Sequence, residues 1–172
     1  MKPEIKYGLL IGLGVCAWIL LEFAIGLHTT RMALGEYTGF VSNLIPLVGL
    51  YALLRMRLES SSDGRLTLGQ GIYAGVLASL VAAVLVYSFL VAYNQVINPG
   101  WIDLALDWKV ANMRAAGQPE PFIREQILSY RNAYSPTGLV GSILVGMTLM
   151  GGIFSLFLTL LLRWRRGVGR SG

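Results

Sequence analysis

A single acid, Glu22, stands inside a hydrophobic stretch that runs from Tyr7 to Leu27. A carboxylate in an apolar spanning segment is costly, so it usually has a polar partner or faces a water-filled cavity. Glu22 is therefore either a packing or gating acid near one membrane face or the functional acid of a binding cavity. The candidate partners of this acid are His28, Arg31 and Tyr93.

Catalytic chemistry finds little support in the residue pattern. The one histidine, His28, lies six residues after Glu22, so the two would not share a face of a continuous helix. We interpret it as a polar end group rather than a catalytic base. Asp103 and Asp107 are four residues apart and share a helix face, as paired hydrolase carboxylates could, but we interpret them as part of the ordinary solvated face of an amphipathic helix. With Cys16 as the one cysteine, no metal-ligand cluster is present, and we expect no enzyme, no cofactor and no metal.

The elements that must position these residues are membrane helices. Hydrophobic residues make up 55% of the 172 residues and charged residues 13%, against about 25% charged in soluble domains. Four apolar runs are each long enough to cross a bilayer as a helix. The sequence therefore predicts an all-α polytopic membrane protein with one membrane domain and four spans. These spans are expected at about residues 5–27, 37–54, 68–97 and 137–162.

Several local signals set the boundaries of these spans. A polar link is expected at residues 28–36, and Pro46 predicts that the second span is short or kinked. Thr67 with Gln70 three residues later predicts a capping box that opens the third span. Residues 98–136 predict an amphipathic helical hairpin outside the membrane, with Asn98 as the N-cap of its first helix. The second hairpin helix is expected from Pro121 to Tyr134, and residues 163–172 form a basic tail.

The basic residues are distributed unequally about the spans. Of the 14 basic residues, nine flank the side that holds both termini and the short loop: Lys2, Lys6, Arg55, Arg57, Arg65, Arg163, Arg165, Arg166 and Arg170. The other five share the hairpin side with acids. The positive-inside rule then predicts cytoplasmic termini and an outward-facing hairpin in the cell inner membrane. The same rule explains the net charge of +5, so nucleic-acid binding is not expected.

Small residues recur at every fourth position in three of the predicted spans. Such ladders let two helix backbones approach closely, either within the bundle or at the surface of a homo-oligomer or a membrane-protein partner. The ladder positions are Gly8, Gly12, Gly71, Gly75, Gly138, Ser142 and Gly146.

The two halves of the chain also begin and end alike. Gly8 and Gly12 open the first span as Gly71 and Gly75 open the third, and Leu-Leu-Arg ends both the second and the fourth. This pattern fits a parallel repeat of two helical hairpins. Coincidence is the alternative, since such residues are common in membrane helices.

Three segments together resemble a known bacterial family. They are Trp18 to Glu22 followed by Gly26-Leu27-His28, Thr67 to Gly71 leading into Gly75, and Tyr93 to Pro99. These segments resemble domain-of-unknown-function family 4199, and the helix order fits along nearly the whole chain. The resemblance implies a small four-helix inner-membrane protein, and it brings no activity, cofactor or catalytic residue with it.

Two functional hypotheses follow from these observations. The first is a non-enzymatic helix-bundle module, surrounded by membrane lipid, that binds itself or a membrane partner. The alternative is a small transporter or a lipid- or small-molecule-binding membrane protein that uses Glu22 in a cavity. What Glu22 contacts distinguishes the two hypotheses.

Overall fold

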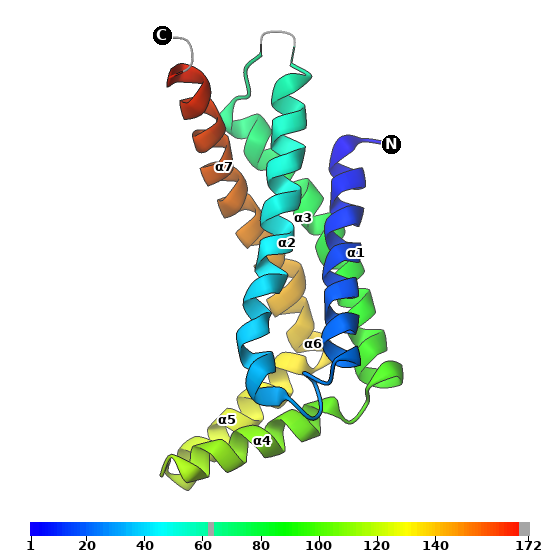
Figure 1. Ribbon diagram of the computed structural model, residues 1–172, viewed down its shortest axis with the longest axis vertical. Helices are drawn as coiled ribbons and strands as arrows, with labels where there is room; N and C mark the ends of the chain where they lie inside the picture. The colour runs from blue at the N-terminus through cyan, green and yellow to red at the C-terminus, as the bar shows by residue number, and fades with distance from the viewer. Residues whose placement is uncertain (62–63, 169–172) are drawn as a thin grey trace.

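Four long helices lie side by side in the computed structural model, which describes residues 1–61 and 64–168 (Figure 1). They are α1 (Pro3–Ala24), α2 (Met32–Glu59), α3 (Leu68–Ala92) and α7 (Thr148–Val168). The third helix continues into a π-helical segment, η1 (Tyr93–Ile97). The last is preceded by the short α6 (Pro136–Leu139) and a second π-helical segment, η2 (Val140–Met147).

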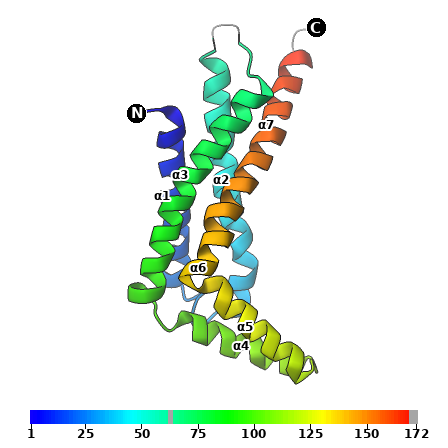
Figure 2. The same cartoon turned by 180° about the vertical axis from the view of Figure 1, so that it is seen from behind.

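A helical hairpin crosses one end of this bundle. It consists of α4 (Trp101–Ala115) and α5 (Glu120–Tyr134), and Figure 2 shows it from behind, at the end opposite both termini. Within the described residues, four segments are long and apolar enough to cross a membrane: Pro3–Ala24, Val41–Glu59, Leu68–Ile97 and Pro136–Trp164. The predicted all-α fold with four spans is therefore confirmed, and the half-to-half repeat stays a prediction.

The bounds of the third span agree with the sequence, and those of the first two differ. The capping box that opens α3 is confirmed, because Thr67 and Gln70 each bond the other's backbone N–H. However, α1 ends at Ala24, and α2 begins at Met32, so most of the predicted polar link is helical. Pro46 lies inside the 28-residue α2, which is not short, although its apolar part covers only Val41–Glu59.

Two further helix boundaries differ from the sequence prediction. The N-cap of α4 is Gly100 rather than Asn98, whose side chain is used elsewhere. The last helix continues to Val168, so the predicted tail is helical at its start, and residues 169–172 lie outside the described residues.

The bundle is held together by close helix contacts and a core of small and branched side chains. An added Cβ at Gly8 would lie 2.6 Å from the carbonyl oxygen of Ala78, and one at Gly12 would lie 2.9 Å from Leu85 Cδ2. The first ladder therefore lies between α1 and α3. The α3–α7 contact is formed by Gly71 against Thr159 and by Gly75 against Ser155.

The third ladder does not lie at such a contact. Gly138 lies against the backbone of Asn132 at the end of α5, and the exposed Ser142 donates a hydrogen bond to the Gly138 carbonyl, 3.2 Å away. A Cβ at Gly146 would meet only the carbonyl oxygen of Gly141, at 3.6 Å. The reason is local: the π-helical η2 changes the register of this stretch, so fourfold spacing no longer follows one face.

Candidate functional site

The end of α1 folds His28 back toward Glu22. Gly26 has a φ of 83°, a left-handed conformation that glycine adopts without strain. The N–H of Leu27 donates to the carbonyl of Glu22 at 2.8 Å, and that of Gly26 donates to the carbonyl of Phe23 at 3.0 Å. This is a Schellman motif, which reverses the chain after the helix. On a continuous helix His28 would not share a face with Glu22, but α1 ends at Ala24, and the turn at Gly26 brings His28 back beside the acid.

A chain of polar contacts begins at Glu22. His28 Nε2 lies 3.6 Å from Glu22 Oε2, and His28 Nδ1 lies 2.7 Å from the hydroxyl of Tyr93. The amide of Asn98 donates to the same hydroxyl at 3.1 Å. The Tyr93 hydroxyl can donate its proton to Nδ1 while it accepts from Asn98, an arrangement that suits the tautomer with the proton on Nε2, toward Glu22. The chain thus orients the imidazole toward the acid.

Glu22 itself is well buried, and of its two carboxylate oxygens Oε2 faces His28, at 3.6 Å from Nε2. The residue is 7% exposed, and among the described residues its Oε1 has no hydrogen-bond partner. A buried acceptor without a partner loses the hydration that it has in the unfolded chain. The unsatisfied oxygen therefore makes the burial of this carboxylate costly.

The π-helical end of α3 brings the remaining polar groups together. The N–H of Asn98 donates to the carbonyl of Tyr93 at 2.9 Å, a bond that spans five residues. This wider turn places Asn98 next to Tyr93, which is 1% exposed. Asn94 accepts a hydrogen bond from Trp101 Nε1 at 2.7 Å, so the first residue of α4 is fixed to η1. Sequence reasoning assigned Asn98 to a helix cap and so missed this role.

A cavity of about 600 Å³ lies beside Glu22, between the ends of α1 and α2 and the hairpin. Half of its lining residues carry aromatic rings: His28 stacks on Trp101 at 5.6 Å between ring centroids, and Trp101 meets Tyr134 edge-on at 5.0 Å. The cavity carries one lysine, Lys109, whose Nζ lies 5.6 Å from the ring centroid of Tyr130. The lining residues are Glu22, Leu27, His28, Met32, Gly35, Tyr37, Trp101, Ala105, Trp108, Lys109, Tyr130 and Tyr134.

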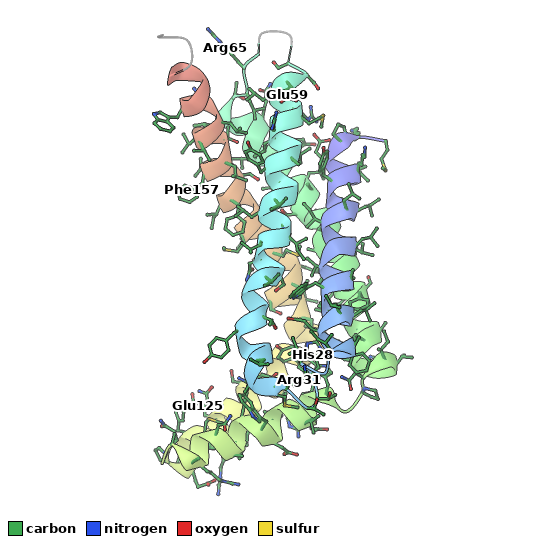
Figure 3. All side chains as sticks on the ribbon, in the orientation of Figure 1. His28, Arg31, Glu59, Arg65, Glu125 and Phe157 are labelled. Atoms are coloured by element: carbon green, nitrogen blue, oxygen red, sulfur yellow. The ribbon has the colours of Figure 1, made fainter. Side chains whose placement is uncertain are left out.

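The three candidate partners of Glu22 have different positions. His28 contacts the acid directly, and Tyr93 holds His28 from the other side. Arg31 is exposed and is the N-cap residue of α2, with its N–H bonded to the Gly26 carbonyl at 2.8 Å. No ion pair joins it to Glu22 in the described part of the chain. Figure 3 shows His28 and Arg31 at the end of the bundle nearest the hairpin.

Comparison with known proteins identifies the family to which the chain belongs. Residues 6–163 match the family described as "Protein of unknown function (DUF4199)". The chain belongs to this family. The matched residues include the Glu22 contacts and the whole hairpin, so the candidate site of this DUF4199 chain lies inside the family's own segment. No curated protein and no solved structure matches the chain.

The histidine of this DUF4199 chain should titrate below its ordinary range. Burial lowers the pKa of His28 from 6.5, and the nearby Glu22 carboxylate opposes this by raising it. The contribution of His28 to stability is therefore present above pH 6.5 and is lost as the pH falls from there toward the folded pKa. We expect Glu22→Gln to lower the pKa of His28 further, because the opposing charge is removed.

This expectation can be measured directly, because His28 is the one histidine in the sequence and gives one imidazole signal by NMR. Asp107→Asn is the matched control: Asp107 is exposed on α4 and does not line the cavity, so the same loss of charge should leave the titration unchanged. An identical His28 pKa in Glu22→Gln and in the unmodified protein would show that Glu22 does not act on the imidazole.

A second buried acid, Glu4, lies at the other end of the bundle. It is 1% exposed, and the guanidinium of Arg57 from α2 contacts its carboxylate. Sequence reasoning counted Arg57 among the basic residues that flank the spans and did not single out Glu4, because no local pattern connects positions so far apart. Because Glu4 and Glu22 lie near opposite ends of α1, the Glu4–Arg57 pair of this DUF4199 chain is separate from the candidate site.

Proposed function

We propose that the protein is a non-enzymatic integral membrane protein that binds a lipid or another small molecule in the cavity beside Glu22. One observation carries this proposal: a nearly buried carboxylate with an unpartnered oxygen lines a cavity of about 600 Å³. A ligand that donates a hydrogen bond to the Glu22 carboxylate at the cavity wall would be held by a charge-assisted bond. Aromatic walls with a few polar groups are typical of ligand sites.

Binding is favoured over catalysis by what the cavity wall contains. The described lining holds no serine, threonine or cysteine, so it lacks a hydroxyl or thiol nucleophile of the kind that a neighbouring histidine activates. The imidazole is already held on both nitrogens, by Tyr93 and by Glu22, which suits a positioning role. Binding is also favoured over transport, because the bundle beyond the cavity is filled by fully buried side chains such as Leu50, Leu53 and Ala78.

Self-association with another copy or a membrane partner has less support than the sequence alone suggested. The ladders at Gly8/Gly12 and Gly71/Gly75 lie between helices of the same chain, so they are not available as a surface for a second chain. Oligomeric state and partners are tested by the experiment below.

The proposed location is the inner membrane of a bacterial cell, with cytoplasmic termini. The termini lie at one end of the bundle and the hairpin at the other (Figure 1). Nine of the 14 basic residues flank the end with the termini, which supports a cytoplasmic position for that end by the positive-inside rule. The cavity would then open on the outer side of the membrane.

Filling the cavity should release the ligand. Ala105 lines the cavity on α4, so we expect Ala105→Trp to occupy part of the space and to remove most of the small-molecule adducts that the purified protein carries. The measurement is native mass spectrometry of protein extracted in mild detergent, which reports bound adducts and oligomeric state in one spectrum.

The control is Ala111→Trp, which adds the same side chain at an exposed position of α4 that does not line the cavity. This variant should keep the adducts of the unmodified protein. Equal adduct levels in the two variants would contradict the proposal. A stable dimer, or a co-purified protein in place of a small ligand, would favour the partner-binding module instead.

A further inference from the structure

The two charged side chains of the described cavity wall already have contacts within the protein. Glu22 Oε1 is an enclosed atom, and Oε2 faces His28, at 3.6 Å from Nε2. Lys109 is engaged as well, with its Nζ 5.6 Å from the centroid of the Tyr130 ring. One acid and one amine line the same cavity, so their charges balance and do not select a charged ligand.

Three neutral donors of the same wall have no acceptor in the described part of the chain. They are the hydroxyls of Tyr37 and Tyr134 and the indole N–H of Trp108. None of the three is an enclosed atom, so each can meet an acceptor that lies in the cavity. A hydroxyl or an indole N–H bonds well to an uncharged carbonyl oxygen. The wall therefore favours a ligand that carries several such acceptors.

The cavity lies at the depth where a membrane lipid carries its carbonyl groups. The apolar part of α2 begins at Val41, and Tyr37 precedes it by four residues, or about 6 Å along the helix. Glu22 lies in the last turn of α1, whose span ends at Ala24. Both residues place the cavity at the border between hydrocarbon and headgroups, where tyrosine and tryptophan are enriched and where the ester groups of glycerolipids lie.

One face of α2 connects the cavity with the hydrocarbon. Leu44 and Val48 follow Tyr37 by seven and eleven residues, so the three side chains share a helix face. All three are more than half exposed, and Leu44 and Val48 belong to the apolar part of α2. This face is therefore turned toward lipid, and the cavity lies where it begins, at Tyr37. An acyl chain could follow this face while its ester group enters the cavity.

From these observations we infer that the ligand is a diacyl glycerolipid of the membrane, held by its ester carbonyls. The hydroxyls of Tyr37 and Tyr134 and the N–H of Trp108 donate to these carbonyls, and an acyl chain lies along Leu44 and Val48. The inference rests on the proposed function, since it names the ligand class of the same cavity. It implies that the ester linkage of a lipid, and not its headgroup alone, decides whether the lipid is retained.

The test compares an ester lipid with its ether analogue by native mass spectrometry. The protein is placed in micelles with equal amounts of diacyl phosphatidylglycerol and of dialkyl phosphatidylglycerol that has chains of the same length. The ether form lacks both carbonyls, whereas a hydrogen bond from the shared headgroup to Glu22 is the same for the two lipids. We expect the ester form to be retained in preference by about 5-fold or more, the factor that one hydrogen bond typically contributes.

Tyrosine-to-phenylalanine substitutions remove the donors and keep the rings. Tyr37→Phe combined with Tyr134→Phe should lower the preference for the ester form by about 5-fold. The matched control is Tyr73→Phe, because Tyr73 is an exposed tyrosine near the start of α3, at the other end of the bundle, and does not line the cavity. This control should keep the preference of the unmodified protein.

The outcomes separate the ligand class from the binding function. Equal retention of the ester and ether forms, or a preference that the double substitution leaves unchanged, would overturn the inference. If adducts are lost in Ala105→Trp but show no preference for the ester, the ligand class is wrong and the binding function stands. If no adduct depends on Ala105, both fail.

A second arm asks whether the acyl chains are needed. Glyceryl triacetate, a soluble triester without long chains, is titrated into the protein in maltoside micelles, and binding is followed by calorimetry. Weak binding next to retention of the diacyl lipid supports the membrane as the source of the ligand. Tight binding that Tyr37→Phe with Tyr134→Phe weakens would overturn the membrane as the source. Tight binding that the double substitution leaves unchanged would overturn the assignment of the donors as well.

Discussion

Arg57→Gln is expected to destabilise the bundle far more than Arg55→Gln, although the two arginines lie two residues apart on α2. Arg57 contacts the carboxylate of Glu4, which is 1% exposed, so removing the guanidinium leaves a buried charge without its partner. Breaking a buried ion pair in this way costs about 3 kcal/mol, taken at the low end because Arg57 itself is partly exposed. Arg55 pairs with Glu59 on the open surface of the same helix, where loss of the pair changes little.

Thermal unfolding of the two variants in detergent measures this difference. A second substitution tests the cause: Glu4→Gln in the Arg57→Gln protein should recover much of the loss, because two neutral groups then replace the unpaired charge. Equal unfolding temperatures for Arg55→Gln and Arg57→Gln would show that the Glu4–Arg57 pair does not stabilise the bundle. A double variant no more stable than Arg57→Gln would assign the loss to the packing of Arg57 instead.

Local sequence signals predicted the four spans, because a membrane helix is determined by an apolar run of residues that are adjacent in the sequence. The third span has the predicted bounds, since Thr67 and Gln70 fix its start within one turn. The start of α2 was missed because charged and polar residues near it resemble a loop, whereas Met32 and Leu34 continue the helix beyond its apolar part. A helix that projects beyond the hydrocarbon has no apolar run to mark its end.

The sequence predicted which residues belong to the candidate site, but it did not predict how their side chains contact one another. Glu22, His28 and Tyr93 were all named from the sequence, yet the contact of His28 with Tyr93 joins positions 65 residues apart. The link between Glu22 and His28 depends on the left-handed Gly26, and the link between Tyr93 and Asn98 depends on a π-helical turn. The helix end at Gly26 could have been predicted from the sequence, because glycine just after an apolar run is the usual C′ residue of a Schellman motif. The π-turn and the cavity wall had no such signal.

The close approach of α3 and α7 gives the last prediction. Gly75 of α3 lies directly against Ser155 of α7, a fully buried residue, so a methyl group at position 75 would overlap the serine side chain. Overpacking of this kind costs about 1–3 kcal/mol. Gly75→Ala should therefore lower the unfolding temperature even though alanine favours a helix more than glycine does, by about 1 kcal/mol in a helix interior. Gly69→Ala should not, because a Cβ at Gly69 meets nothing within 4 Å.

A compensating substitution separates steric overlap from any other effect of the alanine. Ser155→Gly removes the side chain that the new methyl group at position 75 would meet, and the next atom, the carbonyl oxygen of Gly151, lies 3.3 Å from the added Cβ. We expect the two substitutions to be less harmful together than the sum of their separate effects, with a coupling of about 1 kcal/mol or more, as for residues in direct contact. Additive effects in this double-mutant cycle would contradict the contact. Gly75 would then again be a candidate for a face that contacts another chain, as in the hypothesis of a module that binds itself or a membrane partner.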